Sequence, residues 1–214
     1  TIPRIGLASM AMVGSGLLGG FILSPMFGLF LVGYIVATLS YSLYFKRVAI
    51  ADIFMLAFLY LSRIVGGIII SEAVLSFWIF GFTFLLFLSL AAAKRYVELK
   101  MNAEKGKLAI QGRGYRAEDL PAISGLGIAT GVASCIVLGL YSNSEQVLNL
   151  YHQPEWFWGI CTMALFWISR VWFITHRGEM HDDPIVFALK DRPTWVLAVI
   201  SVAFVLLSQP VPAT

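Results

Sequence analysis

Long apolar stretches, separated by short polar segments, dominate the chain. Seven of them are close to the roughly 20 mostly apolar residues that a membrane-crossing helix needs. They cover residues 5–23, 26–45, 49–70, 73–93, 121–141, 156–175 and 194–209. Because backbone N–H and C=O groups find no partners in lipid, such stretches form helices and not open strands. The pattern therefore predicts an all-α, multi-pass transmembrane helical bundle that forms one domain over residues 1–214.

Proline and glycine indicate where these helices begin and where they pack. A serine–proline pair at 24–25 separates the first two stretches, since proline favours a helix start and disrupts a helix interior. The glycine pairs Gly16/Gly20 and Gly127/Gly131 are each spaced four residues apart. This spacing lets helix backbones approach closely in a membrane, so both pairs predict helix packing and not chemistry.

Composition supports a lipid environment. The 214 residues are 59% hydrophobic and 13% charged, and the mean hydropathy is +0.83. A water-soluble domain carries about twice that charged fraction. The net charge of +3 does not indicate nucleic-acid binding, because the basic residues lie in short loops between apolar stretches. Cys135 and Cys161 fall inside apolar stretches, which predicts buried free thiols and no disulfide.

Lysine and arginine are distributed very unequally between the two sets of alternate loops. Arg63 and Arg170 lie inside apolar stretches, and the other basic residues all belong to one set of loops: Arg4, Lys46, Arg47, Lys94, Arg95, Lys100, Lys105, Lys107, Arg113, Arg116, Arg177, Lys190 and Arg192. Since basic loops stay on the cytoplasmic side, we expect a bacterial inner (plasma) membrane protein whose N-terminus is cytoplasmic and whose C-terminus is outside. The chain begins with threonine and not methionine, which predicts processing or the C-terminal part of a longer chain.

Three charged residues inside apolar stretches are candidates for a functional site. Asp52 and Arg63 are 11 residues apart, about 1100° of helical rotation, so they lie on one helix face. Two charges on one face of a membrane helix predict a polar cavity. Arg63 is deep in its stretch, which favours a pocket role. Arg170 is nearer the cytoplasmic end, where snorkelling to the interface and a pocket role are equally compatible with the sequence.

The charged loops offer further candidates. Lys94 and Arg95 precede Glu98 by four and three residues, which fits either a helix-end ion pair or a phosphate clamp beside a carboxylate. Carboxylates and basic residues gathered at one membrane face suit a magnesium–phosphate site, or ordinary solvated loops. His176 and His181 flank acidic residues, but this spacing alone is weak support for a transition-metal site.

Several segments resemble the UbiA superfamily of intramembrane prenyltransferases. The similarity covers essentially the whole chain and is most specific to the branch with polyprenyl-phosphate phosphoribosyltransferases and proteins fused behind a haloacid-dehalogenase-type domain. It is carried by Tyr41-Ser42-Leu43-Tyr44-Phe45-Lys46-Arg47 followed by Asp52, by Arg63 with Gly66-Gly67, by Lys94-Arg95-Tyr96-Val97-Glu98-Leu99, and by His176-Arg177-Gly178-Glu179-Met180-His181-Asp182-Asp183-Pro184.

The resemblance implies a nine-helix fold, of which this chain would lack the first two helices. The family's first aspartate-rich motif follows its second helix, and nothing like it occurs in the 214 residues. The second motif belongs in the loop at 94–120, which offers Glu98, Glu118 and Asp119 but no Asp-x-x-x-Asp. This departure favours the phosphoribosyl-type branch over a standard diphosphate-ionising mechanism.

By resemblance we expect a transferase that acts on a polyprenyl lipid and a diphosphate-bearing donor, with Mg²⁺ as cofactor. The implied catalytic residues are Asp52, Lys46 and Arg63. The implied substrate- and phosphate-binding residues are Tyr41, Lys94, Arg95, Arg113, Arg116 and Arg170. Asp52 and Glu98 would hold Mg²⁺. We expect Asp52→Asn to abolish turnover in a protein that still folds.

Two other functions remain open at this point. The chain can be a non-catalytic membrane subunit, or a truncated UbiA-like protein that packs against other membrane subunits in a larger complex. The absence of the first aspartate-rich motif favours this alternative. A transporter is less favoured, because the stretches show no inverted repeat.

Overall fold

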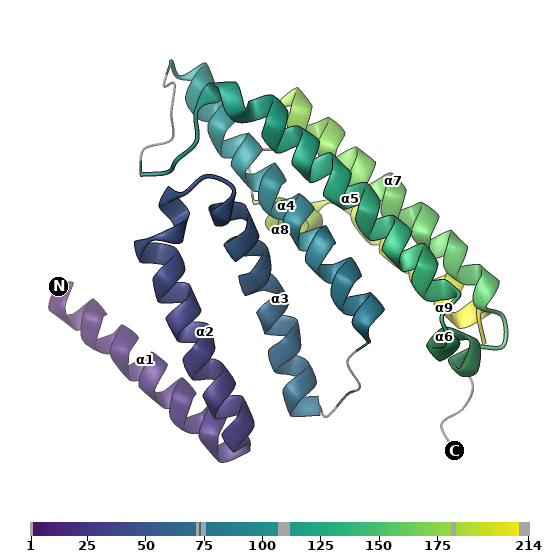
Figure 1. Ribbon diagram of the computed structural model, residues 1–214, viewed down its shortest axis with the longest axis horizontal. Helices are drawn as coiled ribbons and strands as arrows, with labels where there is room; N and C mark the ends of the chain where they lie inside the picture. Colours follow the sequence, from purple (N-terminus) through teal and green to yellow (C-terminus); the bar gives the residue numbers. More distant parts are fainter. Residues whose placement is uncertain (1, 72, 74–75, 107–111, 181–182, 210–214) are drawn as a thin grey trace.

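The computed structural model describes residues 2–71, 73, 76–106, 112–180 and 183–209, and these residues are almost entirely helical (Figure 1). The long helices are α1 (Ile2–Leu23), α2 (Pro25–Leu43), α3 (Ala51–Ser71), α4 (Phe77–Glu104), α5 (Leu120–Ser142), α7 (Phe157–Arg177) and α9 (Arg192–Leu207). Two short helices, α6 (Glu145–Leu150) and α8 (Pro184–Lys190), and 3-10 turns at Phe45–Arg47, Ala117–Asp119 and Pro154–Trp156 connect them. No strand occurs in the described part of the chain.

The all-α architecture predicted from the sequence is confirmed for the described residues, and several of the helices are suited to a membrane. Each of the seven predicted stretches contains a helix, and five helical segments are long and apolar enough to cross a membrane: Pro25–Arg47, Ala51–Ser71, Phe77–Glu104, Ala117–Ser142 and Pro154–Arg177. The apolar segments Ala11–Leu23 and Arg192–Leu207 are shorter than this. Length and composition thus support five membrane spans. The expected seven spans would also require the two shorter apolar helices to cross the membrane.

The fourth predicted stretch ends too early. The sequence places the helix end at 93, but α4 continues to Glu104. The apolar stretch ends where charged residues begin, but the helix can continue beyond that point. Lys, Arg, Glu and Leu are all strong helix formers. Lys94, Arg95 and Glu98 therefore lie on a rigid helix and not in a loop.

Close packing of α4, α5 and α7 forms the most buried part of the bundle. A Cβ on Gly127 would lie 2.0 Å from Trp172 of α7, and one on Gly131 would lie 2.8 Å from Ser89 of α4. Trp172 Nε1 donates to Ser89 Oγ (3.0 Å), which donates to the Gly127 carbonyl (2.7 Å). The predicted packing role of this glycine pair is confirmed.

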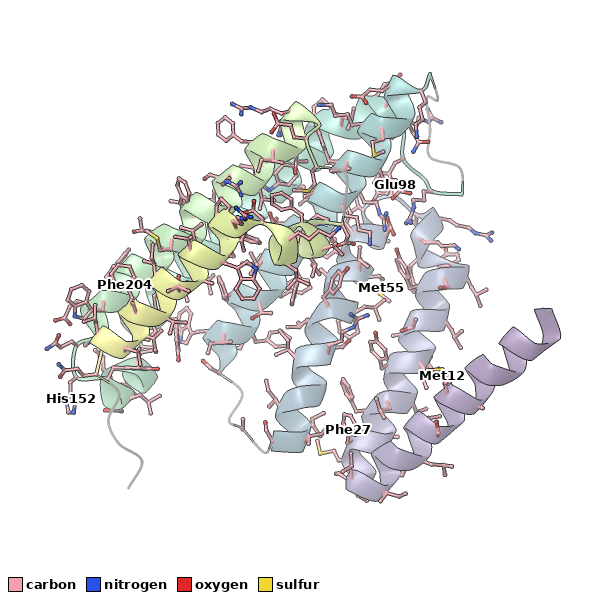
Figure 2. The ribbon with its side chains drawn as sticks, turned by 180° about the vertical axis from the view of Figure 1, so that it is seen from behind. Met12, Phe27, Met55, Glu98, His152 and Phe204 are labelled. Atoms are coloured by element: carbon pink, nitrogen blue, oxygen red, sulfur yellow. The ribbon has the colours of Figure 1, made fainter. Side chains whose placement is uncertain are left out.

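The α1–α2 hairpin is much less buried than this core (Figure 2). Pro25 begins α2, as predicted. A Cβ on Gly20 would lie 2.5 Å from Leu31, whereas one on Gly16 would meet open space. Gly20 therefore allows the predicted close approach of the two helices and Gly16 does not, because the helices contact each other near the turn.

The connections alternate between the two ends of the bundle (Figure 1). Residues 45–50 after α2 and residues 112–119 before α5 meet at one end, and the α1–α2 turn and the end of α9 lie at the other. Figure 2 places Glu98 near the first end, and Phe27 and His152 near the opposite end. The basic residues Lys46, Arg47, Arg113 and Arg116 in these two connections thereby lie at one end of the molecule.

Candidate functional site

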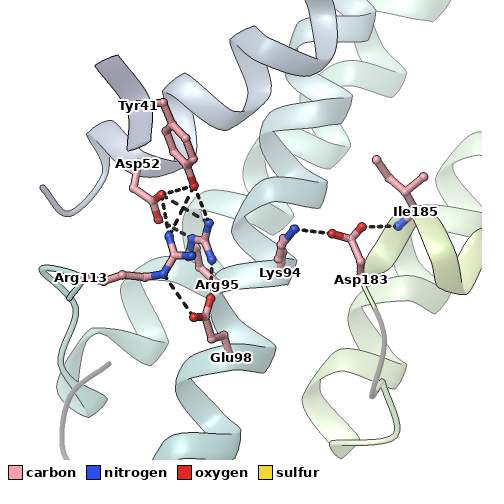
Figure 3. A network of polar contacts seen from close by, with 8 residues as sticks. All are labelled: Tyr41, Asp52, Lys94, Arg95, Glu98, Arg113, Asp183 and Ile185. Atoms are coloured by element: carbon pink, nitrogen blue, oxygen red, sulfur yellow. Dashed lines mark hydrogen bonds and ion pairs between the residues drawn. The ribbon is translucent and has the colours of Figure 1, made fainter. Parts of the chain in front are cut away.

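Asp52 lies at the centre of a polar cluster at this end of the bundle (Figure 3). It occupies the first turn of α3 and is 0% exposed. Tyr41 Oη donates to its Oδ1 (2.9 Å), as does Arg113 Nη1 (3.0 Å). Arg95 donates from Nε to Oδ2 and from Nη2 to Oδ1 (3.3 Å). A carboxylate removed from water requires such partners, and here two guanidinium groups compensate its charge.

Glu98 completes the cluster on its more open side. It accepts from Arg95 Nη1, and its Oε1 accepts from Arg113 Nε (3.2 Å). Burial disfavours the charged form of Arg113, but the hydrogen bond with Tyr41 and the nearby carboxylates outweigh this and raise the pKa of Arg113. The side chain of Arg95 is 1% exposed, whereas that of Arg113 is 20% exposed. Arg113 is thus the guanidinium of the cluster that an incoming ligand can reach.

The loop before α5 brings Arg113 to Asp52 through close backbone contact with the α2–α3 connection. A Cβ on Gly114 would lie 2.7 Å from the Arg47 carbonyl oxygen, so only glycine fits without a shift. Tyr115 is buried beside it, and its hydroxyl accepts from the backbone N–H of Ile50 (2.9 Å). Burial raises the pKa of Tyr115 to about 12, which keeps the hydroxyl neutral.

Lys94 points to the other side of α4 and does not pair with Glu98. Its Nζ donates to Asp183, whose Oδ1 accepts from the backbone N–H of Ile185 at the start of α8 (3.0 Å). Figure 3 shows this pair next to the cluster but separate from it. The compact Lys94–Arg95–Glu98 group expected from the sequence is therefore divided between two faces of the helix.

A cavity of about 560 Å³ lies beside the Lys94–Asp183 pair, between α3, α4 and α8. Most of its lining is apolar, and the residues are Tyr60, Arg63, Ile64, Phe87, Leu90, Asp183, Ile185, Val186 and Ala188. Arg63 is exposed here, donates from Nε to Tyr34 Oη (3.2 Å), and lies 5.5 Å from the Tyr60 ring centroid. The structure does not bring Arg63 to Asp52, although both belong to α3.

Arg170 also lies outside the cluster. Its Nη1 and Nη2 donate to the two carboxylate oxygens of Asp191 (2.7 and 3.0 Å), at the junction of α8 and α9. Asp191 caps α9 through the backbone N–H of Thr194 (3.0 Å). Burial alone would raise the pKa of Asp191, but the hydrogen bonds from Arg170 and Thr194 lower it below the ordinary value. This pair fastens three helices together.

The remaining predicted residues make no side-chain contact with the cluster within the described ranges. Lys46 is partly exposed in the 3-10 turn after α2, and Arg116 is exposed before α5. His176 Nδ1 contacts the Trp172 carbonyl (3.0 Å). His181 and Asp182, which the sequence suggested as neighbours of a metal, lie outside the described residues.

Magnesium ligation by the described residues alone does not fit this geometry. Among them, no group of three or more His, Cys, Asp or Glu side chains comes together. Asp52 and Glu98, the carboxylates that the resemblance assigns to Mg²⁺, are both bound by guanidinium groups. A bare ion would have to displace an arginine from either of them.

The burial of Asp52 changes what the Asp52→Asn variant can be expected to report. The sequence predicts that Asp52→Asn leaves a folded protein, but removal of one partner from a buried ion pair costs about 3–5 kcal/mol. The substitution therefore tests folding as much as chemistry. Arg113, which is more exposed, is the better probe.

Three partners could not be identified from sequence spacing. Asp183 and Asp191 lie in the predicted polar segment, and each precedes a helix that begins with or contains an early proline, which signals a helix cap. That signal does not predict which lysine or arginine pairs with them. Tyr115 follows Gly114, and only the fold shows that it supports Ile50.

The sequence comparisons found two curated relatives. An uncharacterized protein, y4nM, of Sinorhizobium fredii is 39% identical over 202 residues, which cover 94% of this chain and 39% of the relative. The nodulation protein NoeC of Azorhizobium caulinodans is 28% identical over 150 residues, which cover 69% of this chain and 48% of that protein. The chain thus spans less than half the length of each. No family model matches the chain.

Proposed function

We propose that the chain is a UbiA-type membrane transferase that acts on a polyprenyl lipid and a diphosphate-bearing donor, by prenyl or phosphoribosyl transfer. The proposal rests on the family resemblance. The observation that supports it best is the polar cluster of Tyr41, Asp52, Arg95, Glu98 and Arg113 at the end of membrane helices. Ionisable groups gathered within membrane helices often mark a substrate site.

Arg113 would be the group that first meets the phosphate. Its fork of N–H donors suits two phosphate oxygens at once, and Glu98 is the partner that it can release most easily because Glu98 is the more exposed carboxylate. Arg95 and Asp52 would stay in place and hold the geometry. Negative charge that develops on a departing diphosphate would then be stabilised by positively charged groups already in position.

The apolar cavity beside Lys94 would hold the first isoprene units of the lipid. Its walls come mainly from apolar side chains, with Arg63 and Asp183 at the polar part of the lining. Since the lipid chain comes from the apolar bilayer and not from water, moving it against such walls costs little. Lys94 and Arg63 would lie near the phosphorylated end of the lipid.

Magnesium remains part of the proposal as an ion that comes with the diphosphate. Proteins commonly hold Mg²⁺ through one or two carboxylates together with substrate phosphates. Glu98 would supply such a carboxylate once Arg113 has turned to the phosphate. Asp52, fully buried and bound by two arginines, would serve as a positioning residue.

We further propose seven spans, with the basic end of the bundle in the cytoplasm of a bacterial inner membrane. Single cysteines at Lys105 and Leu150, both exposed and at opposite ends, test this orientation. In intact cells an impermeant maleimide should label Leu150→Cys and leave Lys105→Cys unlabelled. The reverse pattern would contradict the orientation and remove the cytoplasmic site with it.

A non-catalytic membrane subunit is the second candidate. One observation favours it: the two carboxylates and two guanidinium groups of the cluster already balance each other, as in a purely structural network. Such a subunit would use its exposed apolar helices to pack against other membrane proteins. It would bind no diphosphate at the cluster.

Diphosphate release separates the two candidates. Purified protein would be given Mg²⁺, a polyprenyl phosphate and either phosphoribosyl diphosphate or a prenyl diphosphate. We expect Mg²⁺-dependent release with one donor, reduced about tenfold to hundredfold in Arg113→Gln, since one hydrogen bond to a charged group is worth about 1.5–3 kcal/mol. Arg177→Gln, an exposed arginine at the end of α7, is the matched control. No release with either donor would leave the subunit as the better account.

A further inference from the structure

Helix α8 is held between two ion pairs that differ in strength. At its C-terminal end, Asp191 receives two hydrogen bonds from Arg170 and two from Thr194. At its N-terminal end, Asp183 is tied to the rest of the bundle by Lys94. The C-terminal end carries more hydrogen bonds and is the natural pivot. At the N-terminal end Pro184 is buried, and the Lys94–Asp183 pair is the ionic contact that an anion can exchange.

The same helix forms one wall of the cavity described above. Ile185, Val186 and Ala188 face the cavity from α8, opposite Tyr60 and Phe87. Tyr60 of α3 and Phe87 of α4 stack on each other (5.3 Å between ring centroids) and form the opposite wall. Movement of the N-terminal end of α8 would therefore change access to the cavity.

Lys94 is well placed to respond to an anion. Its side chain is 34% exposed, and it is the residue next to Arg95 of the buried cluster. Asp183 and Arg63 line the cavity together with Tyr60, and Lys94 reaches the cavity edge through its ion pair with Asp183. A phosphate or diphosphate group carries more negative charge than the carboxylate of Asp183, so it competes effectively for Lys94.

We propose that the Lys94–Asp183 ion pair is an anion-sensitive latch that holds α8 over the cavity. A phosphate or diphosphate group takes Lys94 from Asp183, and the N-terminal end of α8 then moves away from the cavity. No bond is made or broken in this step apart from the exchange of ionic partners. The inference rests on the proposed function for the nature of the anion, and it assigns the control of access to this one pair.

Cysteine labelling tests the latch without turnover. Cys135 and Cys161 are replaced by Ala, and Ala188→Cys reports access to the cavity wall through its rate of reaction with a maleimide. Asp183→Asn breaks the ion pair while it preserves helix capping, since Asn caps a helix as well as Asp does. Leu189→Cys, on the exposed face of α8, controls for general changes, and Val186→Cys repeats the test at a second wall position.

We expect Ala188→Cys to react about fivefold faster in the Asp183→Asn protein. This factor corresponds to the roughly 1 kcal/mol that one partly exposed ion pair contributes. Inorganic diphosphate should accelerate the reaction saturably when Asp183 is present, and chloride at the same ionic strength should not. It should have no effect in Asp183→Asn. A labelling rate in Asp183→Asn no faster than in the parent protein would overturn the latch.

Acceleration by Asp183→Asn without any response to diphosphate would also overturn it, because the anion is the trigger. The transfer assay reports on a different claim. Failure of that assay with an intact response to diphosphate would leave the latch standing and remove the proposed transferase activity. Transfer activity without any change in the labelling rate would support the transferase and overturn the latch.

Discussion

The Asp52 cluster and the Arg170–Asp191 pair use the same chemistry in two different settings. In the cluster, one fully buried carboxylate is bound by two arginines and a tyrosine from three separate segments. In the pair, one carboxylate that is 10% exposed is bound by one arginine and by its own helix cap. The first arrangement connects residues that are far apart in sequence, and the second fastens a local junction.

This difference favours the cluster over the pair as the candidate binding site. Ion pairs that only connect helices do not need complete burial, because burial costs more desolvation energy than the pairing returns in many cases. The cluster carries that cost and still leaves Arg113 and Glu98 partly accessible. Buried charged groups that hold partly accessible charged groups in place are well suited to bind a charged ligand.

The largest expected effect comes from removal of the buried charge. Asp52→Asn should lower the free energy of unfolding by about 3–5 kcal/mol, because it leaves Arg95 buried with less compensation. Asp191→Asn, at the less buried pair, should cost about 1.5–3 kcal/mol, because it weakens the charge-assisted hydrogen bonds from Arg170. Thermal denaturation in detergent measures both. Equal losses for the two variants would show that burial does not distinguish the sites.

A smaller effect is expected where the backbone delivers Arg113 to the cluster. Gly114→Ala should cost about 1–3 kcal/mol, since its new methyl group would lie 2.7 Å from the Arg47 carbonyl oxygen and force the loop to shift. Gly125→Ala in α5 is the matched control, because nothing lies within 4 Å of its added methyl group. The control should be neutral or slightly stabilised, as alanine favours helix. Equal stability of both proteins would contradict the proposed close contact.

Acid should weaken the Arg170–Asp191 pair selectively. The hydrogen bonds from Arg170 and Thr194 lower the pKa of Asp191 below its ordinary value of 3.8 despite burial. The unfolded chain then binds the proton more readily, so the pair contributes stability above about pH 4 and loses it as the pH falls further. The stability difference between the parent protein and Asp191→Asn should shrink below pH 4. A difference that stays constant down to pH 3 would refute the assigned shift.

The smallest effect is expected at the connection that supports the cluster. Ile50 has a φ of 67°, which is strained for a β-branched residue, and its side chain is 60% exposed. Ile50→Gly should raise the free energy of unfolding by up to about 1 kcal/mol, because relief of strain exceeds the loss of a mostly solvent-facing side chain. A fall in the melting temperature would show that the conformation is not strained.

Much of the fold could be predicted from the sequence because lipid imposes a simple rule on the backbone. Apolar length alone located all seven long helices, and the glycine pair at 127 and 131 located a close contact. The end of α4 could not be predicted in this way, since the helix continues through charged residues beyond the apolar stretch. The apolar stretches in the sequence also did not separate the five long helices from the two shorter apolar ones.

The site was predicted in part. Tyr41, Asp52, Arg95, Glu98 and Arg113 were all candidates, and the fold brings them together. Arg63 and Arg170 were candidates for the same reason, an intramembrane charge, but each has a local partner elsewhere: Tyr34 and Asp191. Helical rotation places two residues on one face, but the packing of neighbouring helices decides whether they share a cavity.

Binding of inorganic diphosphate to the purified protein tests the central claim most directly. Isothermal titration calorimetry should show saturable binding to the parent protein, weakened about tenfold or more in Arg113→Gln and unchanged in Arg177→Gln. That result would make the rim of the Asp52 cluster an anion site. Equal affinity in all three proteins, or no binding to any, would show that the cluster only holds the helices together.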